Sequence, residues 1–331
     1  MKRTIILVHG RSHKPPQIAL ERQWKEALHA GFCRDFPAQA NLLTDPKETV
    51  TSFVYYGDKS NEFLSSHERG TPYDPVADTR ERDAMLQKLS TYKKAQFNKS
   101  VYNKLPGKSS FGEAAADALG GILGFMRVSD PLIAQVAPDM RHYWDEDSSF
   151  GTDVRYPMIK PLREAMERQR KAHDAGKGHP IMVIAHSLGT MISYDTFWKF
   201  SHTGEYRDDY PGKISLWITL GSPLADETVK RNLKGAGFDS ARRYPNNVER
   251  WLNVAAEDDY ISHDSFVKDD FRSMENDFKL INSIEDHHIY NLAVRKKLDG
   301  KDKGKSNPHS DLGYLIHPVV TEAVAKWFSK T

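Results

Sequence analysis

The chain has 331 residues, of which 39% are hydrophobic and 28% charged, as in an ordinary globular protein. Its 47 Lys and Arg against 45 Asp and Glu leave a net charge of +2, which gives no reason to expect a nucleic acid or an anionic membrane as the main partner. The single cysteine, Cys33, excludes an intramolecular disulfide or a thiolate metal cluster within one chain and favours a reducing compartment.

We expect neither a membrane span nor a signal peptide. No stretch approaches the roughly 18 apolar residues that a spanning helix needs. The apolar run at 5–8 is shorter than the roughly 7–15 residues of a secretory signal, so we interpret it as a first strand. The sequence therefore predicts a cytoplasmic protein that contacts a membrane surface at most transiently, and it carries no signal for an oligomeric state.

Short aliphatic runs alternate along the chain with segments of helical periodicity. Apolar residues at spacings of three and four predict helices around 20–28, 158–169 and 320–328. Several aliphatic runs are apolar on both faces, which is typical of strands in a parallel sheet covered by helices. The alternation predicts an α/β fold with an open, mostly parallel sheet flanked by helices. The predicted strands lie at 4–8, 51–56, 181–185, 214–220, 250–255 and, with a less regular pattern, 288–294.

One segment, 57–150, breaks this alternation because it contains no convincing strand. It holds a charged helical pattern at 79–98 and a Gly- and Ala-rich apolar stretch, FGEAAADALGGILGFM, at 111–126. An insertion this long in a compact domain is usually functional or disordered. We predict a helical cap or lid within a single domain that spans 1–331, with the apolar stretch facing an acyl chain or an interface. The alternative is a helical decoration whose apolar stretch packs on the core.

A candidate nucleophile stands in the segment VIAHSLGTMISYD at 183–195. Ser187 follows an aliphatic strand pattern and precedes a helical one, with Ala185 and Gly189 two residues to either side. A strand and a helix that cross closely at a sharp turn need small residues at these positions. The turn should lift the hydroxyl out of the sheet and direct the Leu188 N–H at the same space, where the helix start favours negative charge. The alternative is a serine that only caps a helix.

Five segments together resemble a known family: ILVHG at 6–10, VIAHSLGTMISYD at 183–195, WITLGSPL at 217–224, WLNVAAEDDYIS at 251–262 and NPHSDLGYL at 307–315. With them the chain resembles the α/β-hydrolase superfamily, in particular its lipase- and esterase-like serine hydrolases. The resemblance covers the sheet core and both ends of the chain but not the insertion at 57–150, and it distinguishes no subfamily.

The resemblance implies an oxyanion hole made of two backbone N–H groups. One belongs to Leu188, and the other belongs to Arg11, the residue after the His9-Gly10 pair. Arg11 departs from the small or apolar residue often found at this place in the family. Its guanidinium could instead bind an acidic part of the substrate or pair on the surface.

The resemblance also implies an acid and a base, in that chain order. Asp259, which follows a strand pattern and precedes a short apolar pair, matches the acid best. Asp258 is the nearest competitor and Asp226 a more distant one, and residues 257–259 could equally form a solvated acidic turn. Of the 14 histidines, His309 lies in a loop before the closing helix, where the family has its base.

The histidines near these segments have simpler explanations. By strand alternation His186 should point away from the serine and pack or hydrogen-bond locally. His317 should cap the final helix, and His287 and His288 lie at the start of the sixth predicted strand. No spacing among the histidines supports a metal site, and no cofactor is expected.

Ser187, Asp259 and His309 together imply a serine hydrolase that cleaves carboxylic esters through an acyl-enzyme. A thioesterase, amidase, peptidase or acyltransferase would use the same groups, so the expected partner is a small-molecule or lipid-like ester and the bond type stays open. The other class of function is a non-catalytic relative that binds or scaffolds, although every triad position holds a competent residue. Ser187 argues against a haloalkane or epoxide hydrolase, which needs an aspartate nucleophile.

Overall fold

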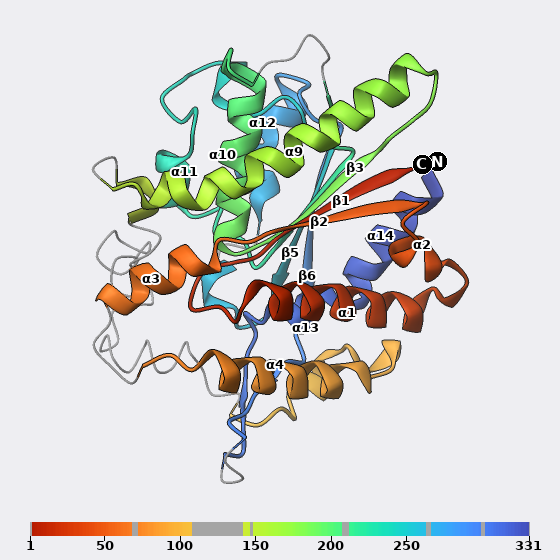
Figure 1. Cartoon of the computed structure of the whole chain (residues 1–331), viewed down its shortest axis with the longest axis vertical. Coiled ribbons are helices and arrows are strands. Elements are labelled where there is room, and N and C mark those ends of the chain that lie inside the picture. The colour runs from red at the N-terminus through yellow and green to blue at the C-terminus, as the bar shows by residue number, and fades with distance from the viewer. Residues whose placement is uncertain are drawn as a thin grey trace.

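The core of the protein is a six-stranded sheet in which all neighbouring strands are parallel (Figure 1). The strand order is β2-β1-β3-β4-β5-β6, which confirms the predicted α/β class with an open parallel sheet. In this computed structural model the residues described are 2–67, 72–107, 142–145, 148–206, 212–262, 266–298 and 302–330. The strands are β1 (Arg3–Val8), β2 (Thr49–Val54), β3 (Ile181–His186), β4 (Leu216–Leu220), β5 (Arg250–Ala256) and β6 (Ser283–Ile289).

Alternate residues of the central strands enter two separate hydrophobic cores, one on each face of the sheet. In β1, Ile6 and Val8 pack in one core, whereas Ile5 and Leu7 pack in the other. β1, β3 and β4 are buried along their whole length. Strands covered on both faces are continuously aliphatic, which explains why the runs at 4–8 and 181–185 identify their positions closely.

Helices cover both faces of the sheet (Figure 1). One face carries α9 (Phe150–Asp174), α10 (Leu188–His202) and α12 (Val267–Asn276). The other carries α1 (Gln17–Asp35), α13 (Asp311–Leu315) and α14 (Pro318–Lys330). The predicted helices at 20–28, 158–169 and 320–328 therefore lie in α1, α9 and α14. The remaining helices are α2 (Asn41–Thr44), α3 (Gly57–His67), α4 (Pro75–Ser90), α5 (Lys99–Tyr102), α11 (Glu227–Asn232) and four 3-10 turns at Pro37–Gln39, Lys94–Gln96, Ala241–Arg243 and Tyr260–Ser262.

The edge strand β6 is where the sequence prediction is wrong. It spans Ser283–Ile289 rather than 288–294, and Val294–Arg295 forms the short β7, which pairs with β8 (Lys305–Ser306) in a separate two-stranded ribbon. Only Ile284 and Ile289 of β6 are buried, one in each core, because the strand has a single neighbour, β5, and stands at the edge of the sheet. A half-exposed edge strand can carry the polar run EDHH, so it lacks the aliphatic pattern that marks the buried strands.

The described part of the insertion packs on the outside of α1. α4 buries Met85, Leu86 and Leu89 in the same core as α1 and adds a further layer on that face (Figure 1). The predicted charged helix at 79–98 is displaced toward the N-terminus, because Asp74 caps α4 and Pro75 starts it. The apolar stretch at 111–126, where we predict a lid surface, lies outside the described residues.

The sheet order creates a crevice at the carboxyl ends of β1 and β3. After β1 the chain forms α1 on one face and returns to β2, whereas after β3 it forms α10 on the opposite face and continues to β4. Loops that diverge in this way leave space between them, and open α/β sheets bind ligands at such points.

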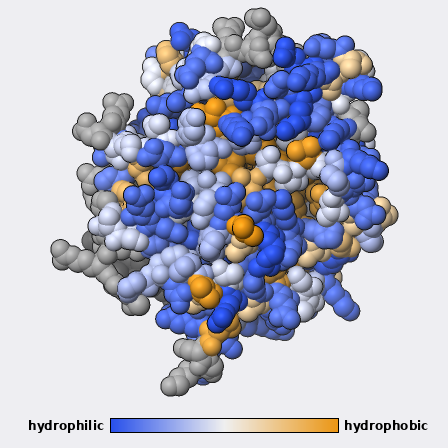
Figure 2. Space-filling view, in the orientation of Figure 1, coloured by the Kyte–Doolittle hydropathy of each residue, from blue (hydrophilic) through white to orange (hydrophobic). Residues whose placement is uncertain are grey.

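The surface of the described residues has no large hydrophobic area in the view of Figure 2, where hydrophobic residues form small separate areas on a mostly hydrophilic face. None of the described helices combines the length and the apolar character that crossing a bilayer requires. The large hydrophobic side chains exposed in the described residues are Ile18, Val76, Tyr156, Phe266, Phe278 and Leu298.

Candidate active site

Ser187 occupies the sharp turn between β3 and α10. Its backbone has φ 52° and ψ −126°, a conformation that non-glycine residues rarely adopt and that costs on the order of 1–3 kcal/mol. Its surroundings hold it there: the Ser187 N–H donates to the Leu220 carbonyl at 3.0 Å, and the Thr190 hydroxyl donates to the Ser187 carbonyl at 2.7 Å. This is the strand-turn-helix geometry expected for segment 183–195.

The loop that follows β1 lies directly against this turn. A Cβ atom on Gly10 would lie 2.8 Å from the Ser187 Cβ. A Cβ atom on Gly189 would lie 2.7 Å from the Val8 carbonyl oxygen and still closer to the carbonyl of His9. Folded proteins do not tolerate such separations, so both positions require a residue without a side chain. The β1 loop and the start of α10 therefore meet where Ser187 turns.

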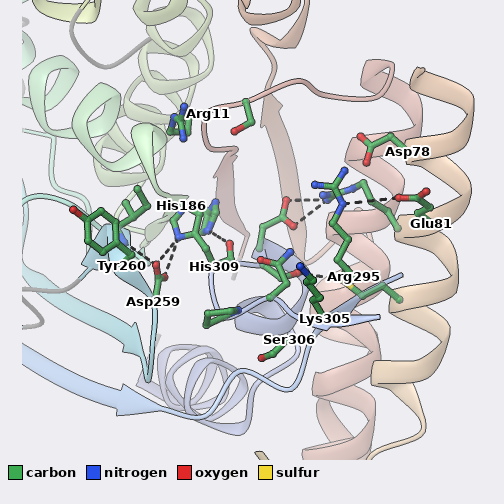
Figure 3. Close-up of a pocket in the computed structure, with 18 of the residues that line it drawn as sticks. Arg11, Asp78, Glu81, His186, Asp259, Tyr260, Arg295, Lys305, Ser306 and His309 are labelled. Carbon is green, nitrogen blue, oxygen red and sulfur yellow. Dashed lines mark hydrogen bonds and ion pairs between the residues drawn. The ribbon is translucent and has the colours of Figure 1, made fainter. Parts of the chain in front are cut away.

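A continuous hydrogen-bonded chain links Ser187, His309 and Asp259. His309 Nε2 lies 3.0 Å from Ser187 Oγ. His309 Nδ1 lies 2.9 and 3.0 Å from the two carboxylate oxygens of Asp259 (Figure 3). Because an ionised carboxylate only accepts hydrogen bonds, the neutral imidazole carries its proton on Nδ1, and Nε2 accepts from the Ser187 hydroxyl. The structure thus brings together three residues that follow β3, β5 and β8.

Asp259 is buried and held by donors other than the histidine. The Tyr314 hydroxyl donates to Oδ2 at 2.6 Å, and the Ile261 N–H donates to Oδ1 at 3.0 Å. Burial raises the pKa of Asp259, but the nearby His309 and the Tyr314 hydroxyl lower it more, so the net pKa lies below its ordinary value. Asp259 is therefore ionised at neutral pH. The sequence motifs did not single out Tyr314, although it belongs to the segment NPHSDLGYL.

The competing carboxylates have other contacts. Asp258 has φ 60° and accepts from the Tyr102 hydroxyl of the insertion at 2.8 Å. Asp226 caps α11, where it accepts from the N–H groups of Thr228 and Val229. His309 contacts Asp259 and neither of these two.

The two predicted oxyanion donors start α10 and follow β1. Leu188 is buried and is the first residue of α10, so its N–H has no partner within the helix. His9 fixes the peptide that carries the Arg11 N–H: its Nδ1 donates to the Gly10 carbonyl at 2.7 Å, and its Nε2 accepts from the Tyr56 N–H at 3.1 Å. Burial lowers the pKa of His9 to about 3, so the ring is neutral at pH 7 and can make both bonds.

The other histidines are placed as follows. His186 packs locally, as expected, but it does not avoid the site: its ring lies 4.6 Å from the ring of His309, and its Nε2 donates to the His309 carbonyl at 3.0 Å (Figure 3). His317 Nδ1 accepts from the Val319 N–H at 3.2 Å, which confirms that it caps α14. His287 and His288 are exposed on β6.

A cavity of about 590 Å³ lies beside His309 and Asp259 (Figure 3). Its walls come from the β1 loop, α4, the loop after β5 and the segment before α13. Charged side chains occur on every one of these walls, which does not match a purely apolar acyl pocket. They are Arg11, Lys14, Asp78, Glu81, Arg82, Asp258, Asp259, Arg295, Lys305 and Asp311.

Ser187 has no exposed surface and is not among the residues that line the cavity. This differs from the expectation that the turn lifts its hydroxyl into open space. The β1 loop at Gly10 and the imidazole of His309 lie against it. A molecule in the cavity therefore reaches Oγ only if one of these covering groups moves.

An ion pair ties α4 to the loop of His309. Asp311 accepts two hydrogen bonds from Arg82, at 2.9 and 3.0 Å, and one each from Trp24 Nε1 at 2.8 Å and the Leu312 N–H at 2.9 Å. Burial raises the pKa of Asp311, but Arg82 and the other nearby cations hold it far below its usual range. Arg82 lies in an ordinary charged helical pattern, so no sequence motif points to this pair.

Among the described residues, no group of three or more His, Cys, Asp or Glu side chains is arranged to hold a metal ion. A scan against protein-family models finds no match for the chain, and searches of curated proteins and of solved structures find no significant match either.

Proposed function

We propose that this protein is a serine hydrolase that cleaves carboxylic esters through a covalent acyl-enzyme. The observation that carries the proposal is the hydrogen-bonded chain from Ser187 Oγ through His309 to Asp259, with distances of 3.0 and 2.9 Å. A serine hydroxyl is a weak nucleophile unless a base removes its proton, and an imidazole oriented by a carboxylate is such a base.

In this mechanism the Ser187 oxygen attacks the ester carbonyl carbon while His309 Nε2 takes the hydroxyl proton. The tetrahedral intermediate expels the alcohol, which receives that proton from His309, and the acyl group remains on Ser187. A water molecule, deprotonated by the same nitrogen, then attacks the acyl carbon; the bond to Ser187 Oγ breaks, this oxygen takes the proton back from His309, and the carboxylic acid leaves. Asp259 holds the Nδ1 tautomer and stabilises the imidazolium, a role that its ionised, buried state supports.

The developing oxyanion is held by the backbone N–H groups of Leu188 and Arg11. Leu188 contributes the free N–H at the start of a 15-residue helix, where the helix dipole favours negative charge. The bonds of His9 fix the peptide plane of the Arg11 N–H before a substrate arrives. Each such donor typically contributes about 10²–10³ in kcat.

The architecture supports a relationship to the α/β-hydrolase superfamily. Those enzymes place a nucleophile in a strained strand-to-helix turn, with the triad in the order serine, acid, histidine. Ser187, Asp259 and His309 follow that order after β3, β5 and β8. The parallel sheet with helices on both faces is compatible with this fold, and the insertion that contains α4 would be its cap.

Labelling with a fluorophosphonate probe tests the proposal. We expect stoichiometric modification of the wild type, no modification of Ser187→Ala, and a loss of most of the labelling rate in His309→Ala. Ser329→Ala, a substitution in the last turn of α14, is the matched control and should label normally. Esters, thioesters and amides of rising acyl length, assayed side by side, then identify the bond that is cleaved.

The burial of Ser187 favours one other function, a non-catalytic member of the same fold that binds a ligand in the charged cavity. Folded wild-type protein that neither labels nor turns over any of these substrates supports that function and refutes the hydrolase. Normal labelling of His309→Ala would instead assign the base to a different group.

A further inference from the structure

A buried lysine stands in the wall of the cavity. Lys14 follows the β1 loop and is 9% exposed, and it lines the cavity together with His309. Its ammonium group donates a hydrogen bond to the Arg11 carbonyl. No carboxylate among the described residues lies within ion-pair distance of it. An ammonium group has three donors, and this one therefore has donors left for a ligand.

Two other cations of the cavity wall already have carboxylate partners. Arg82 makes two hydrogen bonds to Asp311, and Arg295 faces Glu81 at 3.9 Å. The other carboxylates of the wall accept from tyrosine hydroxyls: Asp78 from Tyr73 and Asp258 from Tyr102, both at 2.8 Å, and Asp259 from Tyr314 at 2.6 Å. Lys14 is thus a buried cation, and the charged groups near it form their hydrogen bonds and ion pairs with other residues.

A buried cation that no carboxylate contacts directly is unfavourable. Burial lowers the pKa of Lys14 to about 8, although Asp311 and Asp78 act in the opposite direction. The ammonium is therefore still mostly charged at pH 7 but poorly solvated. A ligand anion would supply the missing counter-charge in a site shielded from water, where charge-assisted hydrogen bonds are strong.

We propose that Lys14 binds an anionic group of the substrate, a carboxylate or a phosphate, so that the enzyme selects acidic esters over neutral ones. This inference rests on the proposed hydrolase function and names its substrate class. Lys14 contacts the carbonyl of Arg11, and the N–H of Arg11 is the proposed oxyanion donor. The anion bound by Lys14 and the reacting carbonyl of the ester would therefore contact the same loop. A cavity of about 590 Å³ has room for a small-molecule ligand of this kind.

The contact with Arg11 could also make Lys14 a purely structural residue, and two substitutions separate the roles. Lys14→Gln removes the charge but keeps a donor for the Arg11 carbonyl, whereas Lys14→Met removes both. Lys47→Met makes the same change in net charge on the exposed turn before β2, at the opposite end of the strands, and is the matched control.

Pairs of substrates that differ in one charge measure the selectivity. Mono(4-nitrophenyl) adipate and 4-nitrophenyl hexanoate differ by a carboxylate on the acyl side. Next, 4-butanoyloxybenzoate and its neutral amide, 4-butanoyloxybenzamide, differ by a carboxylate on the alcohol side. Inhibition of neutral-ester cleavage by adipate and by inorganic phosphate then shows which anion the site prefers.

We expect the wild type to have a higher kcat/KM for an acidic ester than for its neutral counterpart. This ratio should fall roughly 10–100-fold in both Lys14 variants, the range for one hydrogen bond to a charged group. Lys14→Gln should lose far more rate on acidic esters than on neutral ones, and Lys47→Met should behave as wild type. An unchanged ratio, or an equal loss on acidic and neutral esters, overturns the proposal.

Failure of the hydrolase function would give a different result, because wild-type protein would then neither label at Ser187 nor cleave any ester. In that case the thermal midpoint of the wild type and of Lys14→Gln is measured with and without adipate or phosphate. A rise that depends on Lys14 supports the anion site even without catalysis, and a rise of equal size in both proteins, or none, overturns it.

Discussion

Replacing Arg82 by methionine tests how strongly the insertion supports the loop of the proposed base. Arg82 belongs to α4, and its partner Asp311 lies two residues after His309. The substitution keeps the aliphatic stem of the side chain and removes both hydrogen bonds to Asp311. The carboxylate then remains buried with two neutral donors, Trp24 Nε1 and the Leu312 N–H.

The burial of the pair gives the size of the effect. The side chains of Asp311 and Arg82 are 5% and 14% exposed, so solvent screens their interaction only weakly. Removing one partner of a buried ion pair typically costs about 3–5 kcal/mol, because the other charge stays buried without compensation. Since two neutral donors remain on Asp311, we expect a loss of about 3 kcal/mol in the free energy of unfolding, a large part of the roughly 5–15 kcal/mol of a typical domain.

Urea unfolding of Arg82→Met, Asp311→Asn and the double variant measures this loss and its origin. The double variant should be less destabilised than the sum of the two single variants, because no unpaired charge is left in it. Arg295→Met removes a weaker pair from the same wall, with Arg295 69% exposed and 3.9 Å from Glu81, and should cost less than about 1 kcal/mol. A similar small cost for Arg82→Met, or strictly additive losses, would refute the reasoning.

The same structure predicts two further stability effects. Burial lowers the pKa of His9, His186 and His317 to about 3 in the folded protein. In the unfolded chain the pKa of each histidine is near 6.5, so the unfolded state binds more protons than the folded state as the pH falls through that value. We therefore expect the free energy of unfolding to fall by about 4 kcal/mol between pH 7.5 and 5.5 for the three histidines together. An unchanged urea midpoint over this range would contradict the assignment. Gly189→Ala should cost at least about 2 kcal/mol because its Cβ would meet the Val8 and His9 carbonyls, whereas Gly237→Ala, with open space around it, should change the thermal midpoint little.

Sequence patterns identified the parts of the fold whose residues have a uniform environment. β1 and β3 are buried on both faces, so apart from Arg3 and His186 at their ends their residues are apolar or small, and the runs revealed them. β6 is an edge strand with only two buried residues and carries EDHH, so its pattern was weak and its predicted position was displaced. Local patterns therefore identify a strand only as well as burial constrains it.

The residues of the candidate site likewise fall into those that local sequence patterns identify and those that they do not. Ser187 and His309 stand in short segments with strong local requirements, a tight turn and a loop before a capped helix, and motifs point to them directly. Arg82 and Lys14 belong to the site through tertiary packing alone. Arg82 reaches it because α4 packs on α1, and Lys14 reaches it from the segment before α1. The burial of Ser187 was missed for the same reason, because it depends on how the β1 loop lies on the turn.

Because Ser187 is buried and the cavity is charged, a substrate must both displace the cover over Ser187 and match the charges of the cavity. Two cations of the walls are already paired, Arg82 with Asp311 and Arg295 with Glu81, whereas a neutral apolar chain would leave Lys14 without an anion in direct contact. An anion compensates Lys14, whose contact with the Arg11 carbonyl connects it to the loop that covers Ser187. A ligand shifts a conformational equilibrium only by binding one state better than another. An anion that binds Lys14 more tightly when the β1 loop is displaced would therefore favour the conformation in which the Ser187 hydroxyl is accessible.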